Sequence, residues 1–254
     1  MPPPRISKRT MRQVLSIVIL IVSWQLVSWL ANDRALVPPV QDLLAKLFDM
    51  TASFELFVHG LDSLRRVLVA FALGASGGVI LGLAAGAIRP LWTFLEVPLD
   101  FIRSIPPIGF VPLAIAWFGI GEFSKYLVIA YLTVIVVAFG TVSGIRQVDP
   151  TRIRAARCMG LSGWRLFRHV VIPSASRGII GSLHLSLGLS FISLVAVEIV
   201  GSTSGLGFII MDSRLLLQTD RMIVSIITIG VLGILTVLIF GLLLRLLGLT
   251  RFTR

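Results

Sequence analysis

Cysteine, histidine and charge are all scarce in this chain of 254 residues. The single cysteine, Cys158, cannot form an internal disulfide, and it lies in an arginine-rich segment. Charged residues make up only 14% of the sequence, whereas 56% of the residues are hydrophobic and the mean hydropathy is +0.96. A soluble domain needs more polar residues to cover its core, so the composition excludes a water-soluble globular protein.

Acidic residues are also few, because 23 basic residues stand against 12 acidic ones and the net charge is +11. In a soluble protein this excess would suggest a nucleic-acid partner. Here the arginines cluster in short segments between apolar stretches, which is the pattern of cytoplasmic connections in membrane proteins. The lipid bilayer is therefore the expected surroundings, and no nucleic-acid partner is expected.

Six apolar stretches are long enough to cross about 30 Å of hydrocarbon as helices. They are residues 13–32, 67–88, 104–121, 126–145, 178–197 and 222–244. The first stretch is too long for a signal peptide and no Ala-x-Ala cleavage site follows it. The sequence therefore predicts an all-α, polytopic bundle of about six transmembrane helices, with a tight hairpin through 122–125 between the third and fourth.

The lysines and arginines of the connections favour, by about two to one, a topology with both termini in the cytoplasm. Segments 1–12 and 248–254 are then cytoplasmic tails, and 13–32 is the first transmembrane helix. The outer-face loop is 33–62, and the transmembrane core is 63–247 with a cytoplasmic loop at 147–177. In the outer loop, the amphipathic run 40–48 predicts a helix that lies on the membrane surface or packs against the bundle.

Glycine has a regular pattern in the second stretch, where it recurs at every fourth residue. The residues are Gly74, Gly78, Gly82 and Gly86. All four fall on one helical stripe, where a neighbouring backbone can approach closely. The stripe predicts a helix-packing seam, although a seam that slides would have the same pattern.

Proline is concentrated around the third stretch, at Pro98, Pro106, Pro107 and Pro112. Each proline removes a backbone donor and bends or interrupts a helix, and a broken helix at membrane depth usually lines a cavity. Glu96, Asp100 and Arg103 lie nearby, and they are expected either at the cytoplasmic headgroups or along a path through the bundle.

Glu198 closes the fifth stretch, directly before the turn-rich segment 201–207. Its carboxylate is expected either to meet a partner or gate, or to be a solvated helix end. His184, within the same stretch, is more typical of a hydrogen-bonded bundle residue than of a proton carrier. The remaining histidines, His59 and His169, lie in different loops, so the sequence offers no converging catalytic or metal site.

The loop 147–177 has the local signals of helices. Asp149 is a good N-cap, Pro150 a good first residue, and Gly160 is placed to end the helix. Ser162 can cap a second helix that runs to Pro173, where the chain turns toward the membrane.

The spacing Ala155-Ala156-x3-Gly160-x9-Val170-x-Ile172-Pro173 resembles the signature loop of binding-protein-dependent ABC importer permeases, Glu-Ala-Ala-x3-Gly-x9-Ile-x-Leu-Pro. Other stretches resemble the branch for nitrate, sulfonates, taurine and similar small anions. They are 63–66 (Ser-Leu-Arg-Arg), Arg103-x-Ile105-Pro106-Pro107 with Pro112-Leu113, Trp117-Phe118-Gly119-Ile120-Gly121-Glu122-x2-Lys125, Val148-Asp149, and Glu198 with Gly205-Leu206-Gly207. Arg154 departs from the family pattern, which has a glutamate there.

The resemblance implies a type I, MetI-like permease of a bacterial inner membrane, whose coupling helix at 149–160 docks on a separate ATPase. The coupling residues would be Asp149, Arg154, Ala155, Ala156, Gly160 and Pro173. ATP and magnesium would be used by that partner, because the chain itself contains no Gly-x4-Gly-Lys-Ser/Thr phosphate loop. One transport domain per chain also predicts a homodimer, with two ATPase subunits and a soluble binding protein.

The expected function is thus the transport subunit of an importer for a small anion, and no cofactor is expected on this chain. The expected path residues are Arg103, Pro106, Pro107, Ser190, Ser193 and Glu198. An ion-coupled secondary transporter is the alternative, although it usually has midplane charges and two matching halves. The basic loop could also simply bind anionic headgroups, but that role does not need the Ala-Ala-x3-Gly spacing.

Overall fold

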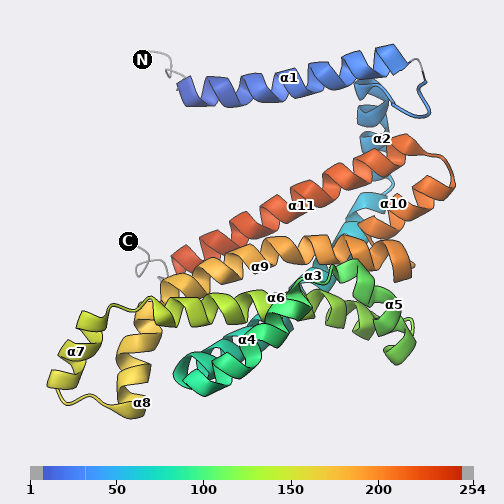
Figure 1. Ribbon diagram of the computed structural model, residues 1–254. Helices are drawn as coiled ribbons and strands as arrows, with labels where there is room; N and C mark the ends of the chain where they lie inside the picture. The colour runs from blue at the N-terminus through green and yellow to red at the C-terminus, as the bar shows by residue number, and fades with distance from the viewer. Residues whose placement is uncertain (1–7, 32, 248–254) are drawn as a thin grey trace.

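The computed structural model describes residues 8–31 and 33–247, and all regular elements in these ranges are helices (Figure 1). In chain order they are α1 (Lys8–Ala31), α2 (Val40–Ala52), α3 (Glu55–Ala87), α4 (Arg89–Arg103), α5 (Pro107–Phe118), α6 (Glu122–Arg146), α7 (Pro150–Cys158), α8 (Gly163–Leu166), the π-helical turn η1 (Phe167–Val171), α9 (Ile172–Gly201), α10 (Leu206–Leu215) and α11 (Thr219–Leu246). The predicted all-α class is confirmed. The predicted tails at 1–7 and 248–254, and Asn32, lie outside the described residues.

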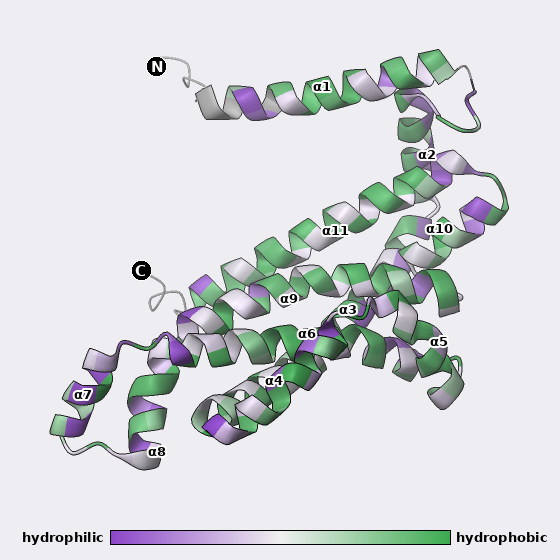
Figure 2. Cartoon of the chain, in the orientation of Figure 1, coloured by the Kyte–Doolittle hydropathy of each residue, from purple (hydrophilic) through white to green (hydrophobic). Residues whose placement is uncertain are grey.

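Five helical segments are long and apolar enough to cross a membrane: α1, α3, α6, α11 and the segment Gly163–Gly201, which contains α9. A sixth span is possible if α4 and α5, which are bent by 96° at their junction, count as one. Figure 2 shows apolar residues around the long helices and hydrophilic residues gathered on α7 and α8. The chain is therefore a multi-pass membrane protein, as expected.

The third span differs from its predicted bounds of 104–121. The bent pair begins at Arg89, and α5 has only 12 residues, about 18 Å of helix, which is too short to span alone. Pro98 and Pro112 lie inside helices, so the break falls at residues 104–106, before Pro107 begins α5. The hydroxyl of Tyr131 donates to the carbonyl of Ile105 at 2.8 Å, which satisfies a backbone acceptor at the break.

The predicted tight hairpin between the third and fourth stretches is present, but its turn lies at 119–121 and not at 122–125. Residues 119–121 connect α5 to α6, and Glu122 to Lys125 form the first turn of α6. Gly119 has a φ of +79°, which turns the chain in the left-handed region where glycine is favoured. The acidic and basic side chains of this turn thereby join the helix instead of a solvated loop.

Helices α3, α6 and α9 form the centre of the bundle. A Cβ atom added at Gly78 would lie 2.6 Å from the carbonyl oxygen of Val134 on α6, and one at Gly74 would lie 2.7 Å from the Cβ atom of Thr133. The other two glycines of the stripe, Gly82 and Gly86, also face α6. The predicted packing seam is confirmed, and α6 is its partner.

A second glycine seam joins α6 to α9. A Cβ atom added at Gly178 would lie 2.6 Å from the Cα atom of Gly144, so only hydrogen fits between the two backbones. Gly140 faces Ser182 in the same way. Helix α6 therefore packs closely against α3 through one seam and against α9 through the other. These contacts fix the positions of the three helices along one another.

Helix α1 lies apart from the bundle and reaches it through α2 (Figure 1). The indole of Trp24 donates to the carbonyl of Pro38 at 3.0 Å, and the hydroxyl of Ser28 donates to that of Val37 at 2.9 Å. The predicted helix at 40–48 is confirmed as part of α2, which packs against the bundle through buried Met50 and leaves Phe48 exposed. The predicted outer loop 33–62 is too long, because 55–62 belong to α3.

Candidate functional site

Helix α7 projects with α8 from one end of the bundle, here called the loop end, where α3 and α6 finish and α9 begins (Figure 1). Asp149 caps α7, because its Oδ1 atom accepts a hydrogen bond from the backbone N–H of Thr151 at 2.7 Å. This bond lowers the pKa of Asp149 below its ordinary value, since it favours the charged carboxylate. The predicted N-terminus of the helix is confirmed.

The other end of α7 closes with a glycine. Gly160 has a φ of +84°, its N–H donates to the carbonyl of Arg157, and the N–H of Leu161 donates to that of Ala156 at 3.0 Å. This pair of bonds is a Schellman motif, which satisfies carbonyls that the helix end leaves free. Helix α7 is therefore short and capped at both ends.

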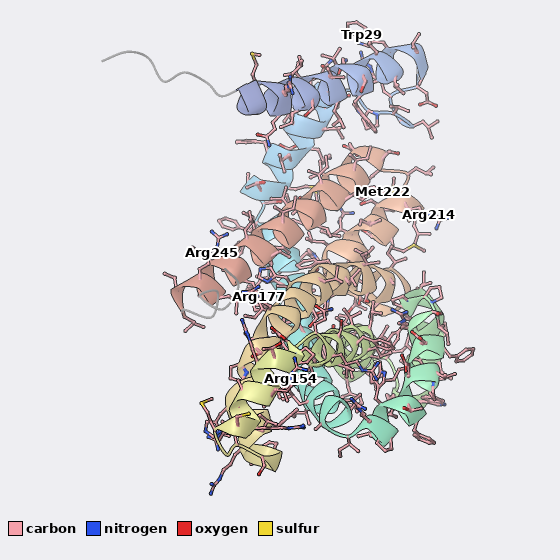
Figure 3. All side chains as sticks on the ribbon, turned by 60° about the vertical axis from the view of Figure 1, so that its left-hand side comes forward. Trp29, Arg154, Arg177, Arg214, Met222 and Arg245 are labelled. Atoms are coloured by element: carbon pink, nitrogen blue, oxygen red, sulfur yellow. The ribbon has the colours of Figure 1, made fainter. Side chains whose placement is uncertain are left out.

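The two alanines of the signature spacing have different surroundings. Ala156 is buried, while Ala155 is exposed. Arg154 is also exposed, and its guanidinium donates to the hydroxyl of Thr151 at 3.3 Å. Figure 3 shows Arg154 at the loop end, with Arg214 and Met222 at the opposite end. Ala155 and Arg154 are thus available to a partner, whereas Ala156 holds α7 against the rest of the loop.

The second half of the loop differs from expectation in two respects. Ser162 precedes α8 but makes no capping hydrogen bond with its side chain. Helical structure does not end at Pro173, because η1 leads directly into α9, although the ribbon changes direction between α8 and α9 (Figure 1). In η1 the N–H of Ile172 donates to the carbonyl of Phe167, five residues earlier, which is the wider turn of a π-helix. The next residue, Pro173, has no N–H to donate.

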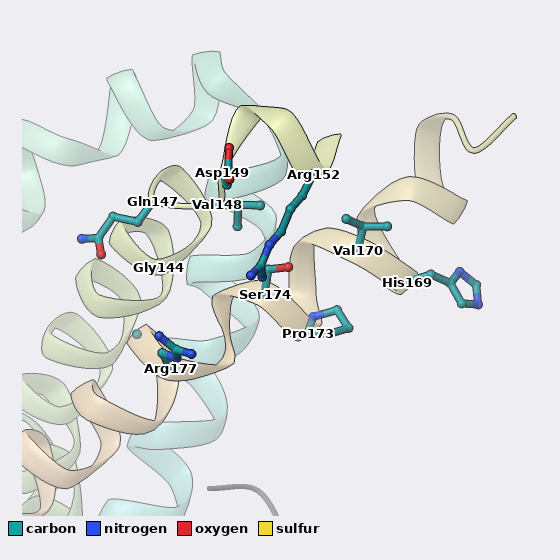
Figure 4. Close-up of a pocket in the computed structure, with 11 residues that line it drawn as sticks. Gly144, Gln147, Val148, Asp149, Arg152, His169, Val170, Pro173, Ser174 and Arg177 are labelled. Atoms are coloured by element: carbon teal, nitrogen blue, oxygen red, sulfur yellow. The ribbon is translucent and has the colours of Figure 1, made fainter. Parts of the chain in front are cut away.

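A cavity of about 610 Å³ lies between α7 and the beginning of α9 (Figure 4). Its polar lining comes from Gln147, Asp149 and Arg152 on one side and from His169, Ser174 and Arg177 on the other. A second cavity of about 420 Å³ shares Gly144, Gln147 and Gly178 with it and extends along α6 and α9 to Arg103. We call the two together the basic groove.

Arg103 is held at the far end of this groove. Its Nε atom lies 2.6 Å from Oδ1 of Asp100, and its guanidinium carbon lies 4.8 Å from the ring centre of Phe139. The side chain remains 51% exposed. Arg103, one of the predicted path residues, therefore lines an open cavity, and the helical break at 104–106 separates it from Pro107.

Glu198 lies at the opposite end of the bundle and is fully buried. Its carboxylate accepts hydrogen bonds from Nη1 of Arg66 at 2.7 Å, from the hydroxyl of Ser63 at 2.9 Å and from the N–H of Gly207 at 2.8 Å. The interpretation of Glu198 as a solvated helix end is wrong. A carboxylate at this depth needs charged and hydrogen-bonding partners, and α3 and α10 supply them.

Arg66 joins a second carboxylate to this group. Its Nε and Nη2 atoms each lie 2.9 Å from an oxygen of Glu122, and Nη1 also donates to the carbonyl of Ser204 at 2.7 Å. Lys125 bonds to Glu122 at 2.8 Å. We call these residues, with Ser63 and Glu198, the buried charge cluster. Both basic side chains of this group, Arg66 and Lys125, are buried.

The buried charge cluster unites motifs that are distant in the sequence. Segments 63–66, 117–125, 198 and 205–207 were noted separately for their resemblance to one permease branch, and their polar residues bond to one another here. Sequence reasoning missed this pairing. The available signal was the position of Arg66 beside an uninterrupted apolar stretch, where an unpaired arginine would be costly.

Two other expected path residues are also buried between helices. The hydroxyl of Ser190 lies 3.1 Å from that of Thr133 and donates to the carbonyl of Ser186, and Ser193 is fully buried. They lie outside the basic groove. His184 contacts the carbonyl of Ile180 at 3.4 Å and the ring of Phe240, as expected of a bundle residue. In the part of the chain that the structure describes, no three His, Cys, Asp or Glu side chains form a possible metal site.

The chain is thus a multi-pass helical bundle with a short helix, capped at both ends, at one end and an open groove beside it. The family described as "Binding-protein-dependent transport system inner membrane component" matches residues 78–249, and the chain belongs to it. It is thus an ABC importer permease, and the family suggested by the loop motif is confirmed.

Curated relatives are similar over most of their length. The aliphatic sulfonates transport permease SsuC of Bacillus subtilis is 34% identical over 227 residues, which cover 89% of this chain and 82% of the relative. The taurine permease TauC of Escherichia coli is 31% identical, covering 86% and 81%. The nitrate import permease NrtB of Synechocystis is 28% identical, covering 90% and 86%.

Solved structures share the fold. An amino acid ABC transporter chain superposes with a TM-score of 0.62 and 23% identity, covering 79% of this chain and 96% of that one. The methionine transporter MetNI, in inward-facing form, gives 0.57 and 18%, covering 70% and 93%. The MetI-like, type I architecture is therefore confirmed.

Proposed function

We propose that this permease imports a small anion, such as a sulfonate, taurine or nitrate, that a soluble binding protein delivers. A separate ATPase, which binds ATP and magnesium, drives it through the loop 149–173. Two copies of the chain form the path, each bound to one ATPase subunit in the cytoplasm. The loop end then faces the cytoplasm of a bacterium, and the buried charge cluster lies near the outer face.

The architecture of α7 carries the coupling part of this proposal. A helix with a satisfied cap at each end does not fray, and buried Ala156 ties it to the packed loop. Exposed Ala155 adds little bulk, so another surface can approach the helix closely. Motion of an ATPase against α7 would therefore be transmitted to α9 through η1.

Arg154 stands where the family pattern has glutamate, which reverses the charge on this surface. We propose that the ATPase groove presents an acidic side chain there, or that this contact does not form. An exposed ion pair contributes only about 0–1 kcal/mol, so docking does not depend on it.

The basic groove supports an anionic substrate. It is lined by three arginines, Arg103 on α4, Arg152 on α7 and Arg177 on α9. Their total positive charge exceeds the negative charge of the two neighbouring aspartates, Asp100 and Asp149. A surplus of positive charge along an open cavity raises the local concentration of anions. The names of the relatives, which mention sulfonates, taurine and nitrate, favour substrates of this class.

Site-directed cross-linking tests the coupling. Ala155→Cys, in a Cys158→Ser background, is treated in native membranes with a short thiol-to-amine reagent. We expect a product that contains an ABC ATPase, whereas the matched variant Thr203→Cys, exposed at the opposite end, gives none. If Ala155→Cys reacts with a thiol reagent but reaches no ATPase, coupling through α7 is refuted.

Uptake measurements test the groove. We expect Arg103→Ala to lower the uptake of a sulfonate or nitrate several-fold, while the control Arg214→Ala, exposed on α10, transports at the wild-type rate. Unchanged capacity and affinity in Arg103→Ala would remove Arg103 from the path. Uptake that persists without any ATPase and follows an ion gradient would instead favour a secondary transporter.

A further inference from the structure

A third cavity lies on the other side of α7 and plays no part in the proposed path. Its volume is about 980 Å³, and it is bounded by the end of α3, the start of α4, the end of α6 and the segment α7–η1. This volume is in the range of pockets that hold molecules of the size of a drug. It lies at the loop end of the bundle, where the long helices leave the apolar region.

The charged lining of this cavity is entirely basic. Arg89, Arg146 and Arg157 line it, and no acidic residue does. Within residues 8–31 and 33–247, no carboxylate lies within ion-pair distance of these three guanidinium groups. Three arginines around one cavity, without a carboxylate among them, provide a recognition site for a phosphate or a similar anion.

One of the arginines is held in place by packing. The guanidinium carbon of Arg146 lies 5.5 Å from the ring centre of Trp92, which is buried and stacks edge-on against Phe139 at 4.9 Å. Arg89 is the first residue of α4, directly after the chain leaves α3. The positive charges are therefore positioned by rigid elements rather than by a loose loop.

Apart from Thr93, the remaining side chains of the lining are apolar. They include Ala85, Ile145, Ile153, Leu166, Phe167 and Val171, with Trp164 exposed over 67% of its surface. Beyond the cavity, Phe94 and Val97 on α4 are 77% and 74% exposed, as side chains that face hydrocarbon are. Tryptophan and arginine beside an apolar wall are typical of the membrane interface.

We propose that this cavity binds the headgroup of one anionic phospholipid, with its phosphate between Arg89, Arg146 and Arg157 and its acyl chains along α4. The apolar wall distinguishes this ligand from a free phosphate, which needs only the arginines. A lipid in this site bridges the corner between α3 and α4 to helix α7. This inference does not depend on the substrate or on the ATPase.

Lipid binding to the purified full-length chain tests the site. Native mass spectrometry measures the affinity for phosphatidylglycerol and for neutral phosphatidylcholine. We expect the wild-type chain to prefer phosphatidylglycerol, and the triple variant Arg89→Gln, Arg146→Gln, Arg157→Gln to bind it at least tenfold more weakly. This loss is expected because each arginine near the ligand contributes about 1 kcal/mol, or about fivefold in affinity. The matched triple variant Arg154→Gln, Arg165→Gln, Arg168→Gln removes equal charge outside the cavity, so its affinity for phosphatidylglycerol should fall less than threefold.

Each other outcome overturns the proposal. Equal weakening in the two triple variants would show a general attraction between charges, without a site. Displacement of the lipid by millimolar inorganic phosphate would assign the arginines to a free anion. An equal affinity for both lipids would remove anion recognition. If the triple variant does not fold, the single variant Arg157→Gln, which changes only α7, replaces it. Its affinity for phosphatidylglycerol should be about fivefold weaker than that of the wild-type chain.

Discussion

Replacing Glu198 with glutamine tests whether the buried charge cluster stabilises the bundle. The glutamine side chain keeps the shape of glutamate, but an NH₂ group takes the place of one acceptor oxygen. That group would face a donor, either the hydroxyl of Ser63 or the N–H of Gly207, because both donate to the carboxylate. Arg66 would also lose the charge that lies 2.7 Å from its Nη1 atom.

The expected cost follows from the burial of both partners. Removing one member of a buried ion pair costs about 3–5 kcal/mol, because it leaves a charge unpaired. Glu122 still bonds to Arg66, so the lower end of this range applies. For a chain of this length, about 3 kcal/mol corresponds to a decrease in Tm of about 6–12 °C. Thermal unfolding of the purified protein in detergent, followed by circular dichroism, measures it.

Glu96→Gln is the matched control. Glu96 lies on α4 and forms no ion pair with any described residue, so its Tm should change by less than about 2 °C. A decrease in Glu198→Gln no larger than in this control would refute the reasoning. The double variant Arg66→Met, Glu198→Met should recover part of the loss, because apolar residues of similar volume carry no desolvation cost.

Three further substitutions address the packing seam and helix α7. Gly78→Ala should lower the unfolding free energy by about 1–3 kcal/mol through overpacking against α6, whereas Gly60→Ala on the same helix, which meets no neighbour, should be neutral or stabilising in the same thermal assay. Asp149→Ala should speed hydrogen exchange in α7 at neutral pH, because it removes the acceptor of the capping bond, whereas Asp149→Asn keeps an acceptor oxygen and should change exchange little. The difference between the wild-type chain and Asp149→Ala should shrink as pH falls through the lowered pKa of the Asp149 carboxyl, and equal exchange in the two proteins at neutral pH would contradict the cap. Gly160→Ala forces a Cβ into the left-handed region at about 1–2 kcal/mol and should also speed exchange in α7, whereas Gly121→Ala, at a φ of −156°, should not.

The elements that local chemistry determines were predictable from the sequence. The length of the apolar stretches predicted the long helices, and the spacing of Gly74 to Gly86 predicted a seam. For α7, Asp149, Pro150 and Gly160 predicted both ends, because capping depends on residues that are neighbours in the chain. The predicted bounds of the third span were wrong, because the search was for stretches without charged residues. Helix α4 mixes apolar and charged residues, so the predicted stretch began only after Arg103.

The partners of charged residues could not be predicted, because they come from distant parts of the chain. Arg66 and Glu198 are separated by 132 positions, and no local pattern connects them. The same holds for Ser190, whose burial results from the height at which α9 packs on α6. The basic groove was predicted only at Arg103, since the contributions of Arg152 and Arg177 require that α7 and α9 lie side by side.

Helix α9 runs for 30 residues without interruption, about 45 Å, from the basic groove to the carboxylate of Glu198. Its first turns lie beside α7, and its last turn is fixed to α3 by the ion pair between Glu198 and Arg66 at the opposite end of the bundle. Since a helix of this kind barely changes length, a shift at one surface must arrive at the other almost undiminished. In the proposed transport cycle, the end of α9 beside α7 and the end at Glu198 would therefore move together as one rigid body.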